Sequence, residues 1–333
     1  MQTNIDFLEL NHSSDTPKYQ QLVNSITNAI ANNILSQGDP LPSVNTICKT
    51  HHLSRDTVFK AYTVLKEQRV IESVPNKGYY VASSTKKILL VLDTFKAYKE
   101  VLYHSFIQNL PSNYITDVQF HHYNIDNFTT IINNGKGKYF KYVVMNFDDV
   151  KVNEVISTLP LEKLLIIDWN IHAKEDSNYV CQNFGSSFYR AMEEAKEMFM
   201  KYNELCFLYP EFTNHPIETV TFFKSFCETH HMNYQVLTDP TSYTIKEGSA
   251  YISVSDRVLA NFLKQCKEKN LEPGLDVGFL SYNETPMKEF IYKGITVVST
   301  DFKVLGTKAA SFIMNDQPLQ EYIETRLIIR ESL

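Results

Sequence analysis

The sequence predicts two domains of different architecture. The first, over residues 1–81, is a winged helix-turn-helix of the α+β type, and the second, over residues 88–333, is a two-lobed α/β domain with doubly wound parallel sheets. Between Gly38 and Val81, two short amphipathic segments flank a tight turn and precede a short strand pair. From Ile88 onward, strongly apolar runs alternate with helical stretches. A chain of 333 residues is also more often two domains than one.

The first predicted helix begins near Pro17, whose ring suits a first turn, and Thr16 or Asp15 can cap it. Asn32-Asn33 and Gly38 provide terminating signals. Its apolar positions recur at helical spacing and should pack beneath the helices that follow. They are Tyr19, Leu22, Val23, Ile26 and Ile30.

Two further helices are separated by a turn at His52-Leu53. Ser43 and Ser54 stand where each helix starts and can accept hydrogen bonds from unpaired backbone N–H groups. A hairpin over 70–81, with its turn at 75–78, forms the wing. An exposed second helix with Arg and hydroxyl groups in its first turn is typical of DNA readers. The predicted DNA contacts are Ser43, Asn45, Ser54, Arg55, Asp56, Thr57, Lys60, Lys77, Gly78 and Tyr79.

These residues resemble the winged helix of GntR-type bacterial regulators. The resemblance rests on four motifs in fixed order: Pro17-Lys18-Tyr19-Gln20, Gly38-Asp39-x-Leu41-Pro42-Ser43, Ser54-Arg55-x-Thr57-Val58-x-x-Ala61-Tyr62-x-x-Leu65 and Lys77-Gly78-Tyr79-x-Val81. It implies operator binding. The family usually has Arg where this chain has Asn45, and Asn can hydrogen-bond but brings no charge. Either the operator differs there, or Lys60 and Lys77 carry more of the affinity.

The charge is unevenly distributed. Residues 16–87 hold nine Lys and Arg against four Asp and Glu, whereas residues 88–333 hold 23 against 31. A basic module on an acidic body fits a DNA-binding head joined to a domain with another task. The N-terminus has neither a basic segment nor an apolar one of signal type, and no apolar run is long enough to span a membrane. We therefore expect a cytoplasmic protein whose five scattered cysteines are reduced.

A short polar linker, 82–87, leads into the α/β domain. Lobe 1 is predicted over about 88–168 and 297–315, and lobe 2 over about 171–293. Ligands of such sheets bind beyond the carboxyl ends of the strands, here between the lobes. The predicted strands are 88–92, 118–123, 142–145, 164–167, 205–208, 234–237, 251–254, 277–280 and 295–298.

Several segments resemble LacI-type effector domains, whose fold is that of periplasmic binding proteins. They are Val180-Cys181-Gln182-Asn183-Phe184-Gly185 with a helix over 186–203, Ser255-Asp256-Arg257-Val258-Leu259-Ala260, 273–279, Asp301-Phe302-x-x-Leu305-Gly306 and the tail 326–332. A GntR-type head on such a body is the layout of the arabinose-repressor subgroup. The resemblance implies a small-molecule effector.

Polar and aromatic side chains that follow the predicted strands are the candidate effector contacts. Carboxylates and amides can bind vicinal hydroxyls while a ring stacks on a sugar's C–H face, so a sugar is the leading ligand class. The candidates are Asp93, Phe95, Tyr98, Asn146, Asp168, Trp169, Asn170, Asp256, Arg257, Asn283 and Phe302. The part played by Asp168, Asn170 and Phe302 is implied by the resemblance.

Each candidate also has a structural interpretation. Asp93 and Asp256 can cap helices, Trp169 can pack between lobes, and Phe95 and Phe302 can be core residues. Related domains also place an Arg in the loop after the strand matching 205–208, and the loop here, YPEFTNHPIET, has none. The effector can therefore bind differently from a typical inducer of that family.

The predicted function is an effector-responsive transcription regulator, a repressor of a sugar-utilisation operon that acts as a homodimer on a palindromic operator. We find no motif of a hydrolase, zinc protease or P-loop enzyme, and no metal-ligand spacing, so we expect no enzymatic activity, cofactor or metal. The alternatives are a cytoplasmic solute-binding protein and a fusion of a regulator with a PLP-dependent enzyme.

Overall fold

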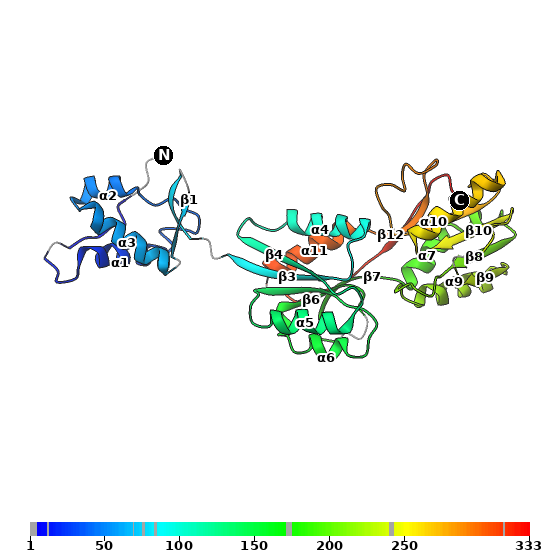
Figure 1. Ribbon diagram of the computed structural model, residues 1–333, viewed down its shortest axis with the longest axis horizontal. Coiled ribbons are helices and arrows are strands. Elements are labelled where there is room, and N and C mark those ends of the chain that lie inside the picture. Colours follow the sequence, from blue (N-terminus) through cyan, green and yellow to red (C-terminus); the bar gives the residue numbers. More distant parts are fainter. Residues whose placement is uncertain are drawn as a thin grey trace. The chain divides into compact units, whose positions relative to one another are not determined.

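The computed structural model describes residues 5–11, 13–68, 70–74, 77–82, 85–170, 175–239, 243–315 and 317–333. The chain divides into two compact units, Met1–Lys86 and Lys87–Leu333 (Figure 1). Strand β3 (Lys86–Leu92) begins two residues before the predicted strand. Lys86 and Lys87 therefore extend the apolar strand and are not part of the linker predicted over 82–87. Ser83 and Ser84 of that linker lie outside the described residues.

The N-terminal unit contains α1 (Lys18–Ala31), α2 (Val44–His51), α3 (Arg55–Glu67) and the antiparallel pair β1 (Ile71–Val74) and β2 (Gly78–Val81). Ser43 and Ser54 cap α2 and α3 as predicted, since their hydroxyls accept bonds from the N–H groups of Thr46 and Thr57 at 3.1 and 3.2 Å. The predicted side-chain cap of α1 is wrong: Pro17 is its N-cap and no side chain caps it. The winged helix-turn-helix fold is confirmed.

The core of this unit joins the three helices to the wing. Its fully buried side chains include Leu22 and Ile26 of α1, Ile47 of α2, and Val58 and Leu65 of α3. The predicted apolar stripe of α1 therefore does pack beneath the later helices, and the polar side of α3 is left exposed. Pro75 and Asn76 of the predicted wing turn lie outside the described residues.

The first lobe of the second unit is a six-stranded sheet in the order β13-β7-β6-β5-β3-β4. Helices α4 (Ala97–Gln108) and α11 (Phe302–Met314) cover one face, and α5 (Ile125–Gly135) and α6 (Val152–Ile156) cover the other (Figure 1). The remaining strands are β4 (Tyr114–Phe120), β5 (Lys141–Met145), β6 (Leu164–Asp168), β7 (Asn178–Gln182) and β13 (Gln320–Ile323), and a short 3₁₀ helix, η1 (Leu161–Lys163), precedes β6.

The second lobe repeats this plan with the order β14-β12-β11-β10-β8-β9. Helices α7 (Ser186–Glu194), α8 (Lys196–Phe199) and α9 (Glu218–Thr229) share one core with the sheet, and α10 (Asp256–Lys269) packs on the opposite face. The strands are β8 (Glu204–Leu208), β9 (Tyr234–Leu237), β10 (Ser249–Ser253), β11 (Gly278–Tyr282), β12 (Thr296–Thr300) and β14 (Thr325–Ile328). The predicted two-lobed α/β class is confirmed.

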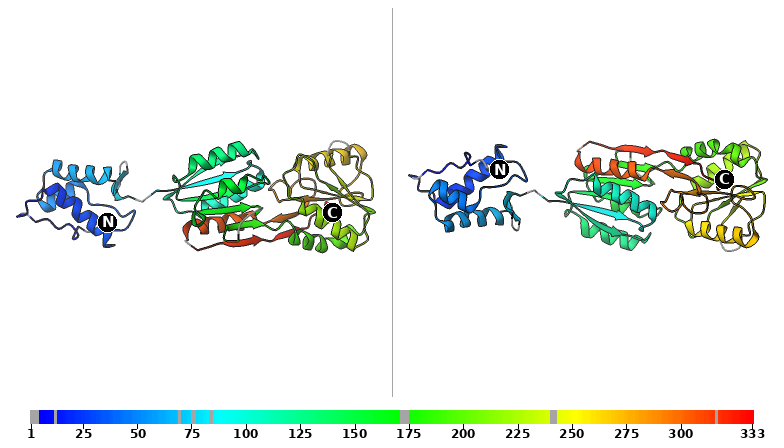
Figure 2. Two further views of the ribbon diagram at one scale, coloured as in Figure 1. Left: turned by 90° about the horizontal axis from the view of Figure 1, so that it is seen from below. Right: turned by 90° about the horizontal axis from the view of Figure 1, so that it is seen from above.

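The lobe boundaries differ from the predicted ones. Strand β7 was expected in lobe 2, but it pairs with β6 in the first sheet, and β12, expected in lobe 1, pairs with β11 in the second. The chain therefore crosses between lobes after β7, after β12 and between β13 and β14, where the red C-terminal segment runs from one lobe to the other (Figure 2). An apolar run identifies a buried strand but not the sheet that it joins, which explains the error. Within the described ranges, no helix is long and apolar enough to cross a membrane.

Candidate functional site: a cavity between the lobes and an exposed helix-turn-helix surface

A cavity of about 430 Å³ lies between the two lobes, at the carboxyl ends of strands from both sheets. The first lobe contributes Asp93, Lys96, Tyr98, Tyr123, Asn146, Phe147, Asp168, Trp169 and Gln182. The second lobe and its connections contribute Phe184, Phe212, Thr213, Asn214, His215, Pro216, Val254, Ser255, Asp256, Arg257, Tyr282 and Asn283. Most of the predicted effector contacts are thus brought together around one space.

Asp93 follows β3 and forms a buried ion pair with Lys99 of α4. Its carboxylate also accepts hydrogen bonds from the Tyr123 hydroxyl and the Thr94 N–H. Burial raises the pKa of Asp93, but the Lys99 charge and these hydrogen bonds outweigh it, so the net shift is downward. The alternative that Asp93 caps a helix is not realised, because the N-cap of α4 is Lys96.

Asp168 ends β6 with a φ of 74°, a left-handed conformation that is uncommon outside glycine. Its carboxylate accepts a 2.6 Å hydrogen bond from the Gln182 Nε2, and burial raises its pKa. Among the described residues, the buried oxygens of the cavity wall without a hydrogen-bond partner include Gln182 Oε1 and Asn283 Oδ1. Such acceptors require donors, and the hydroxyl groups of a polyol are suitable donors.

On the second lobe, Asp256 is the first residue of α10 and pairs with the Lys288 ammonium at 2.8 Å. It does not act as a cap, because the N-cap is Ser255 and no side chain makes a cap bond. Arg257 follows it, and its guanidinium lies 5.3 Å from the centre of the Phe212 ring. The loop noted for its missing Arg therefore lines the cavity through Phe212 and its neighbours.

Aromatic rings form a continuous wall on one side of the cavity. Trp169 meets Phe184 edge-on at 6.4 Å, and His215 lies 5.2 Å from Phe184 and 4.5 Å from Tyr282. Burial, assisted by the nearby Lys96 charge, lowers the pKa of His215 to about 3, so this ring is neutral at ordinary pH. Trp169 both lines the cavity and packs against the core of the second lobe, so its two interpretations are compatible.

Three predicted contacts lie outside this cavity. The Phe95 ring packs edge-on against Tyr103 and Phe120 and does not line the cavity. Asn170 donates to the Tyr322 hydroxyl at 3.3 Å. Phe302 is buried, and its ring centre lies 4.7 Å from that of Tyr98. It lines a separate hollow of about 550 Å³. The structure therefore does not bring these three predicted contacts to the cavity.

Sequence reasoning missed several lining residues. Lys96, Tyr123, Phe147 and Gln182 all lie within a few residues of a strand end, which is the signal that could have found them. The others missed are Phe184, 212–216, Val254, Ser255 and Tyr282. Within the described parts of the chain, no group of three or more His, Cys, Asp or Glu side chains could hold a metal ion.

The predicted DNA contacts lie on and beside α3. Ser43, Asn45, Ser54, Arg55, Asp56, Lys60, Lys77 and Gly78 are exposed, whereas Thr57 and Tyr79 are half-buried. The Tyr79 ring packs edge-on against Tyr62 at 4.6 Å, so much of it belongs to the core. The Lys60 ammonium lies 4.0 Å from the Tyr19 ring centre. Sequence reasoning left out Phe59, which is 41% exposed beside the Arg55 guanidinium.

The two units together define a class of protein: a winged helix-turn-helix domain joined to a two-lobed α/β domain with a cavity between its lobes. Residues 18–81 match the model of the family described as bacterial regulatory proteins, gntR family. The repressor YtrA of Bacillus subtilis is 29% identical over 83 residues, which are 25% of this chain and 64% of YtrA. The regulator YdcR of Escherichia coli is 39% identical over 71 residues, which are 21% of this chain and 15% of YdcR. The matches thus span less than two thirds of these relatives, and the N-terminal unit carries a GntR-type helix-turn-helix.

Solved structures resemble the rest of the chain. The trehalose repressor from Escherichia coli superposes with a TM-score of 0.63 at 12% identity, covering 74% of this chain and 100% of the repressor. A LacI-family regulator from Enterococcus faecium with bound ribose superposes with a TM-score of 0.60 at 13% identity, covering 74% of this chain and 98% of that regulator. The complex of the regulator CelR with cellobiose superposes with a TM-score of 0.62 at 13% identity, covering 88% of this chain and 100% of CelR. At such identities the likeness shows the fold alone: the chain shares the two-lobed α/β fold of these regulators.

Proposed function

We propose that this chain is an effector-responsive DNA-binding transcription regulator, and that a sugar or sugar derivative binds between its lobes. The observation that supports this proposal is a polar cavity whose lining includes carboxylate, amide and aromatic side chains from both lobes. Solved structures of this fold include a regulator with bound ribose and a regulator in complex with cellobiose. We further propose a cytoplasmic repressor of the arabinose-repressor type that acts on a sugar-utilisation operon.

A thermal-shift screen of the full chain against sugars and their derivatives tests this function. A ligand that binds only the folded state raises the melting temperature. A hit should also change the affinity for operator DNA in a gel-shift assay. If hits stabilise the protein but leave operator binding unchanged, the cavity binds a ligand without regulating DNA binding, and the proposal fails.

Arg55→Ala should weaken operator binding by about 1–3 kcal/mol and relax specificity at one base pair, because the first turn of a recognition helix reads base edges. Lys66→Ala is the matched control, since this exposed Lys lies in the last turn of the same helix. Lys77→Ala should mainly reduce the salt dependence of binding, as expected for a phosphate contact. Unchanged operator affinity in Arg55→Ala would show that α3 is placed wrongly on DNA.

The functional unit should be a homodimer on a palindromic operator with half-sites about one helical turn apart. One winged helix alone buries too little surface for tight, specific binding. Sedimentation of the protein, free and with operator DNA, measures this directly. A monomer in both states would contradict the prediction.

A further inference from the structure

The cavity contains more positive charge than its internal ion pairs use. Asp93 is paired with Lys99, and Asp256 with Lys288. Two other cations line the cavity, Lys96 from the first lobe and Arg257 from the second. Among the described residues, neither has a carboxylate within ion-pair distance in the structure. The remaining acid is Asp168, which already accepts a hydrogen bond from Gln182.

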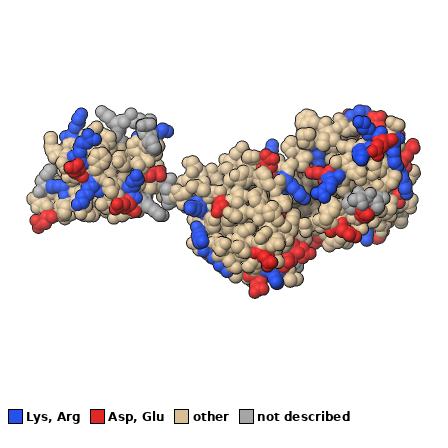
Figure 3. Space-filling view, in the orientation of Figure 1, with Lys and Arg blue, Asp and Glu red and all other residues tan. Residues whose placement is uncertain are grey.

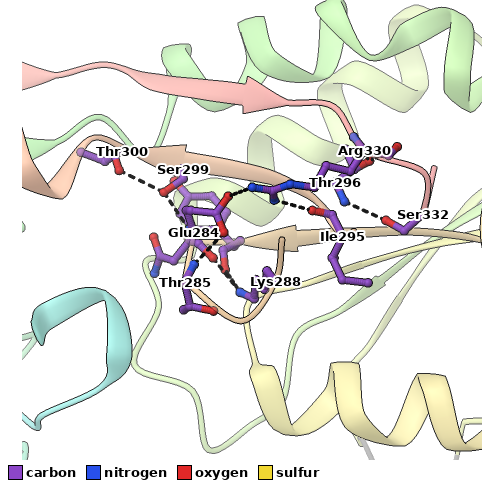
Figure 4. A network of polar contacts seen from close by, with 11 residues as sticks. Glu284, Thr285, Lys288, Ile295, Thr296, Ser299, Thr300, Arg330 and Ser332 are labelled. Carbon is purple, nitrogen blue, oxygen red and sulfur yellow. Dashed lines mark hydrogen bonds and ion pairs between the residues drawn. The ribbon is translucent and has the colours of Figure 1, made fainter. Parts of the chain in front are cut away.

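The Asp256–Lys288 ion pair joins an exposed carboxylate to a buried lysine. The Lys288 side chain is 2% exposed, and its ammonium also donates to the carbonyls of Tyr282 at 3.0 Å and Asn283 at 2.6 Å. These three acceptors use all three of its donors. Figure 4 shows Lys288 beside Glu284, which in turn binds the Arg330 guanidinium at 2.6 Å. These contacts fix the Lys288 ammonium, which is the ion-pair partner of Asp256.

Both free cations stand where a helix begins. Lys96 is the N-cap of α4, Arg257 is the second residue of α10, and neither helix has a side-chain cap bond. The first turns of helices carry partial positive charge and unpaired N–H groups, which favour anions. A separate observation points to a ligand at the same place. Gln182 is 3% exposed and lines the cavity, and its Oε1 has no partner among the described residues.

We propose that the effector carries an anionic group, a phosphate or a carboxylate, which binds between Lys96 and Arg257 while its hydroxyls reach Gln182, Asp168 and Asn283. The inference rests on the proposed function, because it takes this cavity as the effector site. The volume of about 430 Å³ lies within the range of small-molecule sites.

This arrangement also gives the ligand a reason to hold the lobes together. Lys96 and Arg257 come from opposite lobes. An anion between them would make one charge-assisted contact with each lobe. The ligand then binds the closed arrangement better than the open one, which is the condition for shifting the equilibrium. Burial and the Lys99 charge lower the pKa of Lys96 although the nearby carboxylates of Asp93, Asp256 and Asp168 oppose the shift, and a bound anion would further favour the charged form of this lysine.

The test compares matched probes on the full chain: glucose, glucose 6-phosphate and glucuronate, with ribose and ribose 5-phosphate as a second set. Thermal shift and calorimetry should show binding of charged members and little binding of neutral ones. Preference for the phosphates or for glucuronate identifies the anion. Lys96→Met and Arg257→Met should each weaken that binding about 10- to 100-fold, since a hydrogen bond to a charged group is lost. Lys151→Met and Lys224→Met, exposed cations outside the cavity, are the charge-matched controls.

Inorganic phosphate against chloride at equal ionic strength tests the anion site without any sugar. It should raise the melting temperature of the wild type and controls, but not of Lys96→Met or Arg257→Met. Equal stabilisation of all variants, no stabilisation of any, or tighter binding of the neutral sugars would overturn the anion site. A different result overturns the proposed function alone: phosphate stabilisation that depends on Lys96 and Arg257, with no sugar probe that alters operator binding.

Discussion

Lys99→Met should lower the free energy of unfolding of the second unit by about 3–5 kcal/mol, because it leaves the Asp93 carboxylate buried without its cation. Lys99 is fully buried and Asp93 nearly so, and the ammonium is the group that holds the carboxylate ionised. Urea unfolding of the full chain at pH 7 measures the loss. Lys264→Met removes one partner of an exposed pair, Lys264–Glu268, and should cost at most about 1 kcal/mol.

The deficit of Lys99→Met should shrink as the pH falls. In the wild type, the pKa of Asp93 lies below its ordinary value, so its stabilising contribution is present above the unfolded pKa and is lost as pH falls through the folded pKa. In the variant, burial without the Lys99 charge should raise the pKa of Asp93. Protonation of Asp93 at lower pH then removes its unpaired negative charge and reduces the loss of stability. A deficit that is constant between pH 7 and pH 4.5, or the same loss in Lys264→Met, would show that the pair is not the cause.

Much of the fold could be predicted because it depends on local patterns. The caps at Ser43 and Ser54, the apolar stripe of α1 and the alternation of strands and helices after Ile88 all come from neighbouring residues. The predicted strands all have counterparts in the two sheets, some displaced along the chain: the strand predicted at 118–123 is β4, which ends at Phe120. Sheet membership could not be predicted, because β7 and β12 are chosen by partners distant in sequence.

Candidate site residues could be predicted where they directly follow the end of a strand. They could not be predicted where the direction of the side chain determines whether the residue lines the cavity. Asp93, Asn146, Asp168, Asp256 and Asn283 end or follow strands and line the cavity. Phe95 also follows a strand, but its ring packs against Tyr103 and does not line the cavity, and the spacing of apolar residues does not predict this. The ion pairs with Lys99 and Lys288 were not foreseen, since each joins a carboxylate to a lysine that periodicity gives no reason to bury. These pairs reveal which cations remain for a ligand.

Asp256→Ala should leave operator affinity unchanged while abolishing the response to the effector, a non-inducible phenotype. Asp256 is 61% exposed at the side chain and faces the cavity from the second lobe, where a ligand held by the first lobe would meet it. Loss of that contact weakens the ligand's hold on the second lobe, on which its preference for the closed arrangement depends. In a dimer, closure would alter the spacing of the strands that begin near Ile88, and therefore the fit of two heads to two half-sites. The coupling that disappears is about 1–3 kcal/mol, or roughly 5- to 150-fold in operator affinity.

The measurement is operator binding with and without the strongest ligand of the matched sugar screen, in Asp256→Ala and in Glu268→Ala. Glu268 is an exposed acid on the same helix and outside the cavity, so its variant should respond as the wild type does. Lys288 keeps its two carbonyl acceptors in Asp256→Ala, so the variant should remain folded, and its melting temperature without ligand checks this. If the ligand releases DNA from Asp256→Ala at wild-type concentrations, Asp256 takes no part in the effector site, and the preference for closure must come from Arg257 and the rest of the second lobe.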